Sequence, residues 1–563
     1  MQRFVDQTSS KRRSRLARRT WRPSGWSLVV VAVAALIAAP ILVVLSSVLT
    51  PAGEIWRHLA STLLPEYIRN SLLLMLGVGV GTLVIGVGTA WLVTMCRFPG
   101  RRLFEWALLL PLAIPAYILA YAYTDFLQFA GPMQSALRGL TGWGPRDYWF
   151  PDVRSLGGAV VMLTLALYPY VYLLVRAAFL EQAVSTLEAS RSLGWGAWRS
   201  FFVVSLPLAR PAIAAGVTLA LMETLSDFGT VQYFGVVTFT TGIYRTWFGL
   251  GERVAAGQLA AFLLLFIVVL IVVERNLGRR QRGQSGSSRY RKLPGYPLRG
   301  RNGVLAFAVC LLPILLGFLL PAGILLELTL SNSARALAPQ VVEYARNTLT
   351  LATVTALLAV VVALVLAYGK RIRPNGLTRT SARIASIGYA VPGSVIAVGV
   401  LMHLGWIDNR IDEWARASLG LSTGLLLSGT IAGLVFAYLV RFLAMSFGAV
   451  EASLGKITAS MDDAARSLGM RSINTLLRVH VPMLRGSLLT AALLVFVEVT
   501  KELPATLIVR PFNFDTLAVR VYRLASDERL TEAAGGALLI VLVGIVPVIL
   551  LSMAIARSRE LGR

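Results

Sequence analysis

The feature that most constrains this chain is a series of apolar blocks, each of about 20 residues. A helix of roughly 20 residues rises about 30 Å, which is the thickness of the hydrocarbon layer of a membrane. Overall, 56% of the 563 residues are apolar and only 15% are charged, and the mean hydropathy is +0.69. This composition excludes a disordered chain and an ordinary water-soluble enzyme. We therefore predict an all-α polytopic membrane protein.

The apolar blocks predict the number of membrane spans. The first block, Ser27–Leu49, follows a basic start and lacks a small-residue cleavage site before polar sequence, so we expect it to be a retained span and not a signal peptide. Twelve spans are predicted in all, beginning near residues 27, 71, 104, 156, 211, 255, 303, 345, 384, 423, 486 and 535.

Positive charge follows the loops between these blocks. If the N-terminus is inside, the inner segments hold 36 Lys and Arg residues and the outer segments hold 15. A bias of this kind sets the orientation of membrane proteins, so we predict that both termini are cytoplasmic. The formal net charge of +26 is then a consequence of topology, and we expect no nucleic-acid partner.

The two halves of the chain repeat one another. Ile114-Pro115-Ala116 recurs as Val391-Pro392-Gly393 at an offset of 277, and Arg191-Ser192-Leu193-Gly194 recurs unchanged at an offset of 275. We interpret this as a tandem duplication of a six-span unit, with a pseudo-two-fold axis along the membrane normal. The predicted segments are a basic cytoplasmic tail (1–26), a first six-span unit (27–275), a basic cytoplasmic linker rich in Gly, Ser and Pro (276–302) and a second six-span unit (303–563).

Two matched cytoplasmic loops lie between the fourth and fifth span of each unit. Each begins with an acidic residue three positions before an arginine, continues to a glycine, and has a proline thirteen residues after that glycine. This spacing predicts an ion pair on a short helix, a left-handed glycine turn, and a second helix that ends where the proline opens the next span. Taken singly, such a loop is more often an amphipathic segment on the membrane surface, but its repetition in register favours a docking function.

These loops resemble the "EAA" loop of the type I ABC importer permeases, which forms a coupling helix in a cleft of the ATPase subunit. Ser190, Asp463 and Val481 depart from that pattern by small changes. The resemblance implies that the following residues dock the ATPase subunits: Glu188, Ala189, Arg191, Gly194, Pro207, Asp463, Ala464, Ala465, Arg466, Gly469 and Pro482.

The sequence is most similar to one branch, the double-length permeases of ferric-iron uptake systems, through Glu223–Thr230, Thr240–Arg245 and Lys501–Thr506. This resemblance implies a multi-pass protein of the bacterial inner membrane that imports Fe³⁺. It also implies two copies of a cytoplasmic ABC ATPase, which bind ATP and Mg²⁺, and an external solute-binding protein. Related branches carry thiamine or other small solutes, so a permease for such a solute is the alternative.

Four carboxylates within predicted spans point to a pathway. Glu223 and Asp227 match Glu498 and Glu502 at an offset of 275, and each pair lies on one helix face. Charged groups at that depth are costly and tend to face a pathway or a partner, so we predict that these four residues and Lys501 line the translocation path. The alternative is local neutralisation by Lys501 and an arginine.

Motifs for chemistry are absent from the sequence. There is no G-x-x-x-x-G-K-[ST] phosphate loop, and His58, His403 and His480 have no HExxH or CxxC near them. We therefore predict no catalytic, cofactor-binding or metal-binding residue, and a subunit that does not hydrolyse ATP. A gradient-driven secondary transporter remains an alternative of another class, although it would have no reason to keep two matched docking loops. A membrane enzyme is the third hypothesis, and the sequence argues against it because it contains no recognisable nucleophile.

Overall fold

The computed structural model describes residues 25–51, 53–144, 147–181, 190, 192–279, 295–336 and 338–560. In this part of the chain, ten helices are long and apolar enough to cross a membrane, and two bent helix pairs raise the number to twelve if each pair is one span. An all-α polytopic membrane protein is thereby confirmed. The described residues contain one small sheet, in which β1 (Cys96–Arg97) pairs in parallel with β2 (Tyr296–Pro297) at the end of the predicted linker.

The first half of the chain contains six of the candidate spans, of which the third is a bent pair, together with short helices at their ends. Its helical elements are α2 (Gly25–Ser46), η1 (Ser47–Leu49), α3 (Gly53–Thr62), α4 (Leu64–Met95), α5 (Arg101–Ala107), η2 (Leu110–Ala113), α6 (Ala116–Leu127), α7 (Pro132–Thr141), α8 (Leu156–Glu181), α10 (Ala197–Ser200), η3 (Phe201–Ser205), α11 (Leu206–Ser226), α12 (Gly229–Tyr233), α13 (Phe239–Tyr244), η4 (Arg245–Gly249) and α14 (Arg253–Arg279).

The second half repeats this order, again with a bent third span. The tenth predicted span begins later than expected, at Ile431, because the loop before it folds back along the preceding helix through hydrogen bonds from Leu427 and Ser428 to Asp408. The helical elements are α15 (Arg301–Ile314), η5 (Leu315–Leu319), α16 (Leu320–Ser331), α17 (Ser333–Ala336), α18 (Pro339–Ile372), α19 (Gly376–Ala385), η6 (Gly388–Ala390), α20 (Gly393–Leu419), α21 (Ile431–Leu454), α22 (Ala459–Ser467), α23 (Ser472–Thr475), η7 (Leu476–His480), α24 (Val481–Lys501), α25 (Pro504–Val509), α26 (Leu517–Ser526) and α27 (Leu530–Glu560).

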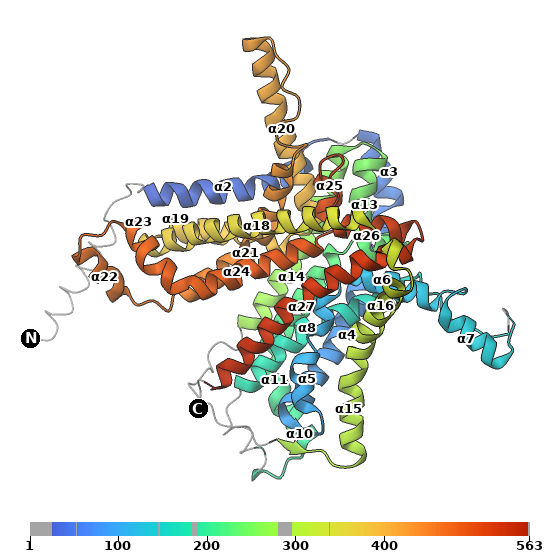
Figure 1. The fold of residues 1–563 in the computed structure, drawn as a ribbon. Coiled ribbons are helices and arrows are strands. Elements are labelled where there is room, and N and C mark those ends of the chain that lie inside the picture. The colour runs from blue at the N-terminus through green and yellow to red at the C-terminus, as the bar shows by residue number, and fades with distance from the viewer. Residues whose placement is uncertain are drawn as a thin grey trace, which may run out of the picture.

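The long helices form two bundles that meet at one end and diverge at the other (Figure 1). In the second half, α18, α21 and α24 run toward α22 and α23. In the first half, α8 and α11 run toward α10. The two segments predicted to dock ATPase subunits therefore lie on separate ends of the diverging bundles.

The two halves exchange their first helices. Helix α2 leaves the first half and packs against α18, α19 and α20 of the second. The contact is close, because Gly369 and Gly399 lie where a Cβ would collide with Val30 and with the carbonyl of Pro40. Small residues of this kind let helix backbones approach one another within a membrane.

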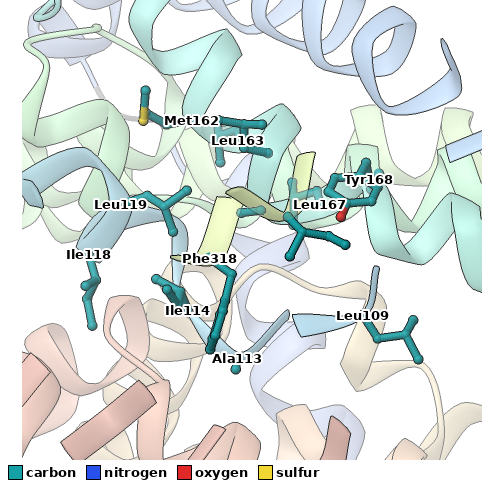
Figure 2. Close-up of a cluster of buried hydrophobic side chains, with 14 of the residues drawn as sticks. Leu109, Ala113, Ile114, Ile118, Leu119, Met162, Leu163, Leu167, Tyr168 and Phe318 are labelled. Carbon is teal, nitrogen blue, oxygen red and sulfur yellow. The ribbon is translucent and has the colours of Figure 1, made fainter. Parts of the chain in front are cut away.

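The corresponding segment of the second half packs on the first. Figure 2 shows Phe318 of η5 among Ile114, Leu163 and Leu167 of the first half. The Tyr123 hydroxyl on α6 also donates a hydrogen bond of 2.5 Å to the carbonyl oxygen of Leu316. Each of the two hydrophobic cores is therefore built from both halves, so the units predicted at 27–275 and 303–563 are contiguous in sequence but interlocked in packing.

A glycine test addresses the packing of η6 against α21. A Cβ at Gly388 would collide with the carbonyl oxygen of Val440, which is backbone and cannot rotate away. We expect Gly388→Ala to destabilise the protein by about 3 kcal/mol, measured by thermal unfolding in detergent. Gly405→Ala on α20 is the matched control, since nothing lies within 4 Å of its Cβ position. Equal melting temperatures for the two variants would contradict this packing.

Candidate functional site

A cavity of about 120 Å³ lies between the two halves. The first half contributes the corner between η2 and α6, one face of α8 and the end of α11, and the second half contributes α21, the end of α24 and the start of α25. The lining residues are Leu112, Ile114, Pro115, Ala116, Tyr117, Leu163, Ala166, Leu167, Tyr170, Glu223, Ser226, Asp227, Arg441, Glu498, Lys501, Glu502 and Pro504.

Prolines break two helices beside this cavity. The chain bends by 88° between the helical segments Arg101–Ala113 and Ala116–Thr141, and by 118° between Gly376–Ala390 and Gly393–Leu419. Pro115 and Pro392 stand at the two bends. The residues before them, Ile114 and Val391, have extended backbones, because proline disfavours a helical conformation in the residue that precedes it. The repeated Ile-Pro-Ala and Val-Pro-Gly segments therefore mark the places where α6 and α20 begin.

The helices α11 and α24 both end at a carboxylate. Asp227 leaves the helical conformation, and its side chain accepts hydrogen bonds from the backbone N–H groups of Thr230 and Val231, each at 3.1 Å. Glu502 occupies the equivalent place and accepts a bond of 3.0 Å from the N–H of Ala505. These carboxylates satisfy backbone donors at the start of α12 and α25, which is the function of an N-cap side chain.

Two cations of the second half neutralise part of this charge. Arg441 on α21 is 6% exposed, and its Nε lies 3.4 Å from Oε2 of Glu502. Lys501 Nζ lies 2.8 Å from Oε1 of Glu498. The alternative of local neutralisation is therefore realised in the second half. Among the described residues Glu223 and Asp227 make no ion pair, so four carboxylates face two cations and the cavity carries an excess of negative charge when all are ionised.

Glu223 instead meets tyrosines. The hydroxyls of Tyr389 on η6 and Tyr170 on α8 lie close enough to the Glu223 carboxylate on α11 to interact with it electrostatically. Because Tyr389 belongs to the second half and the other two residues to the first, this polar chain crosses between the halves.

The structure brings together all five residues predicted for the pathway, since Glu223, Asp227, Glu498, Lys501 and Glu502 line one cavity. Their role in transport stays a prediction. Sequence reasoning missed Tyr117, Tyr170 and Tyr389, and it left Arg441 without an assignment. For Arg441 a signal existed, because an arginine inside a predicted span needs an acidic partner.

The second predicted docking loop lies at the far end of its bundle. Asp463 and Arg466 form the expected ion pair on α22, and Gly469 follows with φ of +75°, the left-handed turn that the spacing predicts. Ala464 and Ala465 lie between them on the same helix. In the first loop, Gly194 has φ of +72°. Glu188, Ala189 and Arg191 lie outside the described residues.

The prediction that a new helix opens at each proline of these loops is wrong. One continuous helix runs from Ser472 to Lys501 through Pro482, and another runs from Trp198 to Ser226 through Pro207. A proline inside a helix lacks an N–H donor, and its ring collides with the carbonyl four residues earlier. The π-helical turns η7 and η3 lie immediately before the two prolines and widen the helix there, which accommodates the rings without a break.

A cluster of polar side chains around Asp462, which we call the Asp462 cluster, attaches α22 to two long helices. Asp462 in the first turn of α22 accepts hydrogen bonds of 2.9 and 2.6 Å from Nε and Nη2 of Arg371, at the end of α18. Its other oxygen lies 3.0 Å from Nε2 of His480, which is fully buried at the start of α24. Arg371 also donates to the carbonyl oxygens of Leu454 and Ile457 in the approach to α22. These contacts connect α22 to both α18 and α24.

The described residues contain no group of three or more His, Cys, Asp or Glu side chains arranged to hold a metal ion.

The chain is similar to known membrane components of transport systems. Residues 82–283 match the family described as "Binding-protein-dependent transport system inner membrane component". The chain is 26% identical over 490 residues to the Fe(3+)-transport system permease protein FbpB 2 of Haemophilus influenzae, an alignment that covers 86% of this chain and 89% of the relative. It is 24% identical over 513 residues to the ferric transport system permease protein FbpB of Actinobacillus pleuropneumoniae, covering 87% and 71%.

A shorter relative aligns with little more than a third of the chain. The molybdenum transport system permease protein ModB of Escherichia coli K12 is 28% identical over 213 residues, which cover 36% of this chain and 89% of that protein. Over residues 82–283 the chain is therefore similar to the binding-protein-dependent transport system inner membrane components, and over most of its length it is similar to permease proteins of ferric-iron transport systems.

Proposed function

We propose that this permease carries Fe³⁺ across the bacterial inner membrane, from an external solute-binding protein to the cytoplasm. Two relatives that align with more than four fifths of the chain are named as ferric-iron permeases. The observation that supports a cationic cargo best is the cavity between the halves, where Glu223, Asp227, Glu498 and Glu502 outnumber Arg441 and Lys501. The cavity of about 120 Å³ suits an ion, since pockets for organic ligands of drug size are usually 300–1,000 Å³.

In this proposal both termini are cytoplasmic, and the loops at 188–207 and 463–482 each bind one copy of an ATPase subunit. ATP, Mg²⁺ and the hydrolysis reaction belong to these subunits. When the two ATPase subunits bind ATP, they approach each other and move the two loops closer together. The Asp462 cluster passes this movement from α22 to α18 and α24. The diverging bundles then rock about the cavity, which opens alternately to the two sides of the membrane.

The test is reconstitution in vesicles of the permease with its ATPase subunits and its binding protein. We expect ⁵⁵Fe³⁺ to accumulate only when ATP and all components are present. Uptake of thiamine, sulfate or molybdate in place of iron would contradict the cargo. Accumulation by the permease alone, against a gradient and without nucleotide, would show a secondary transporter and contradict the mechanism.

A further inference from the structure

A group of buried phenols shares the cavity with the carboxylates. Tyr117 lines the cavity from the first turn of α6, and Tyr170 lines it from α8. The side chain of Tyr117 is only 5% exposed, and its hydroxyl has no hydrogen-bond partner among the described residues. It lies close enough to interact electrostatically with Asp227 of the first half and Glu502 of the second.

Resting on the proposed transport of Fe³⁺, we propose that Tyr117 and Tyr170, together with Glu223 and Glu498, are oxygen ligands that bind the ferric ion during its passage through the cavity. Each half then supplies a carboxylate, and the first half adds two phenols. The carboxylates of the cavity do not suffice to bind the ion alone. The side chain of Asp227 already accepts hydrogen bonds at the start of α12, and Glu502 is paired with Arg441.

The chemistry of the ligands matches that of the ion. Hard, highly charged cations prefer anionic oxygen, and phenolate and carboxylate oxygens are the hardest anionic ligands that side chains offer. On binding, each phenol loses its proton to cavity water as its oxygen forms a bond to the metal, and the iron stays ferric throughout, so no reductant is needed. The Tyr117 hydroxyl is available for this bond, because it is buried without a hydrogen-bond partner among the described residues and a metal bond would satisfy its oxygen.

The resident cations act as counter-ions for the empty cavity. Lys501 holds Glu498 at 2.8 Å, and its flexible side chain can withdraw when a metal ion competes for the same oxygen. Arg441 stays with Glu502, so the ion meets the side of the cavity formed by Glu223 and the tyrosines. Because that side belongs to the first half and Glu498 lies on α24 of the second, rocking of the halves changes the ligand set, which lets the ion leave.

The α6 helix offers a matched control. Tyr121 lies one turn after Tyr117, is also fully buried and also has a hydroxyl without a partner among the described residues. Unlike Tyr117, it does not line the cavity. Tyr117→Phe and Tyr121→Phe therefore remove the same atom from neighbouring turns of one helix, and only the first should affect metal binding.

The experiment uses the permease with its ATPase subunits in lipid nanodiscs, without nucleotide, to which Fe³⁺ is added as the nitrilotriacetate chelate. We expect the difference spectrum against the chelate to show the visible charge-transfer absorption of iron bound to phenolate. Tyr117→Phe and Tyr170→Phe should each lower it by about half or more, Tyr121→Phe should leave it unchanged, and colourless Ga³⁺ should abolish it by competition. Resonance Raman spectra of the wild-type complex give phenolate vibrations independently of how any variant folds.

Two failures are distinguishable. Three results would each overturn the phenol ligands: iron that binds without this absorption, an absorption equal in Tyr117→Phe and the wild type, or no iron binding. ATP-driven iron uptake in the same preparation would still support the proposed function. Absence of iron uptake by the complete system, with uptake of another solute, would instead refute the proposed function.

Discussion

Replacing Asp462 by alanine is expected to uncouple ATP hydrolysis from transport. The carboxylate is about one quarter exposed and joins α22 to Arg371 and His480, so its removal frees the docking helix from both α18 and α24. Breaking a largely buried ion pair costs about 3–5 kcal/mol when one partner is left behind. We expect at least a tenfold loss of ATP-driven uptake in reconstituted vesicles, while the ATPase subunits still bind and hydrolyse ATP.

Glu451→Gln is the matched control for this variant. Glu451 pairs with Lys370, the residue next to Arg371, but it lies on α21, and in the described part of the chain it forms no ion pair with α22. We expect near-normal uptake per ATP hydrolysed. If Asp462→Ala keeps the same ratio of transport to ATP hydrolysis as Glu451→Gln, the Asp462 cluster does not transmit the movement of α22.

Neutralising Glu223 and Glu498 together is expected to have a similarly large effect on transport by a different route. With both changed to glutamine, the remaining carboxylates, Asp227 and Glu502, no longer exceed the charge of Arg441 and Lys501. Lys501 also loses the partner that holds it at 2.8 Å and becomes an unpaired cation in the cavity. We expect Fe³⁺ uptake to fall tenfold or more, which corresponds to about 1.4 kcal/mol.

The control double variant is Glu66→Gln with Glu413→Gln, which removes one exposed carboxylate from each half. Both residues form ion pairs with arginines three positions away on the surface, and such pairs contribute little to stability. This variant should transport normally, and both double variants should assemble with the ATPase subunits. Normal uptake by Glu223→Gln with Glu498→Gln would reduce these carboxylates to structural groups.

The architecture was largely predictable because it depends on local properties. Apolar blocks of about 20 residues indicate membrane helices whatever their neighbours, and the twelve predicted spans correspond to the helices and bent pairs of the structure. The left-handed turns at Gly194 and Gly469 were predictable for the same reason. The breaks at Pro115 and Pro392 were not, since a proline in an apolar segment permits a kink, a helix start or a π turn, and only packing around it decides.

The cavity was predictable only in part. Its carboxylates stand out in apolar spans, and the duplication pairs them without any knowledge of the fold. Tyr117, Tyr170 and Tyr389 gave no such signal, because tyrosine is common in membrane helices and its phenol becomes informative only when neighbours are known. The pairing of Arg441 with Glu502 joins residues on different helices, and nothing in the local sequence specifies it.

The exchange of first helices has a consequence for biosynthesis. Helix α2 leaves the ribosome before the rest of the first half, yet the surface on which it packs, α18 to α20, is translated only after that half and the linker. A single apolar helix is stable in lipid without tertiary contacts, so α2 waits in the bilayer at no great cost. Because both halves are synthesised as one polypeptide, α2 stays covalently connected to α18–α20. The connection keeps α2 close to them in the membrane and limits its contact with unrelated helices.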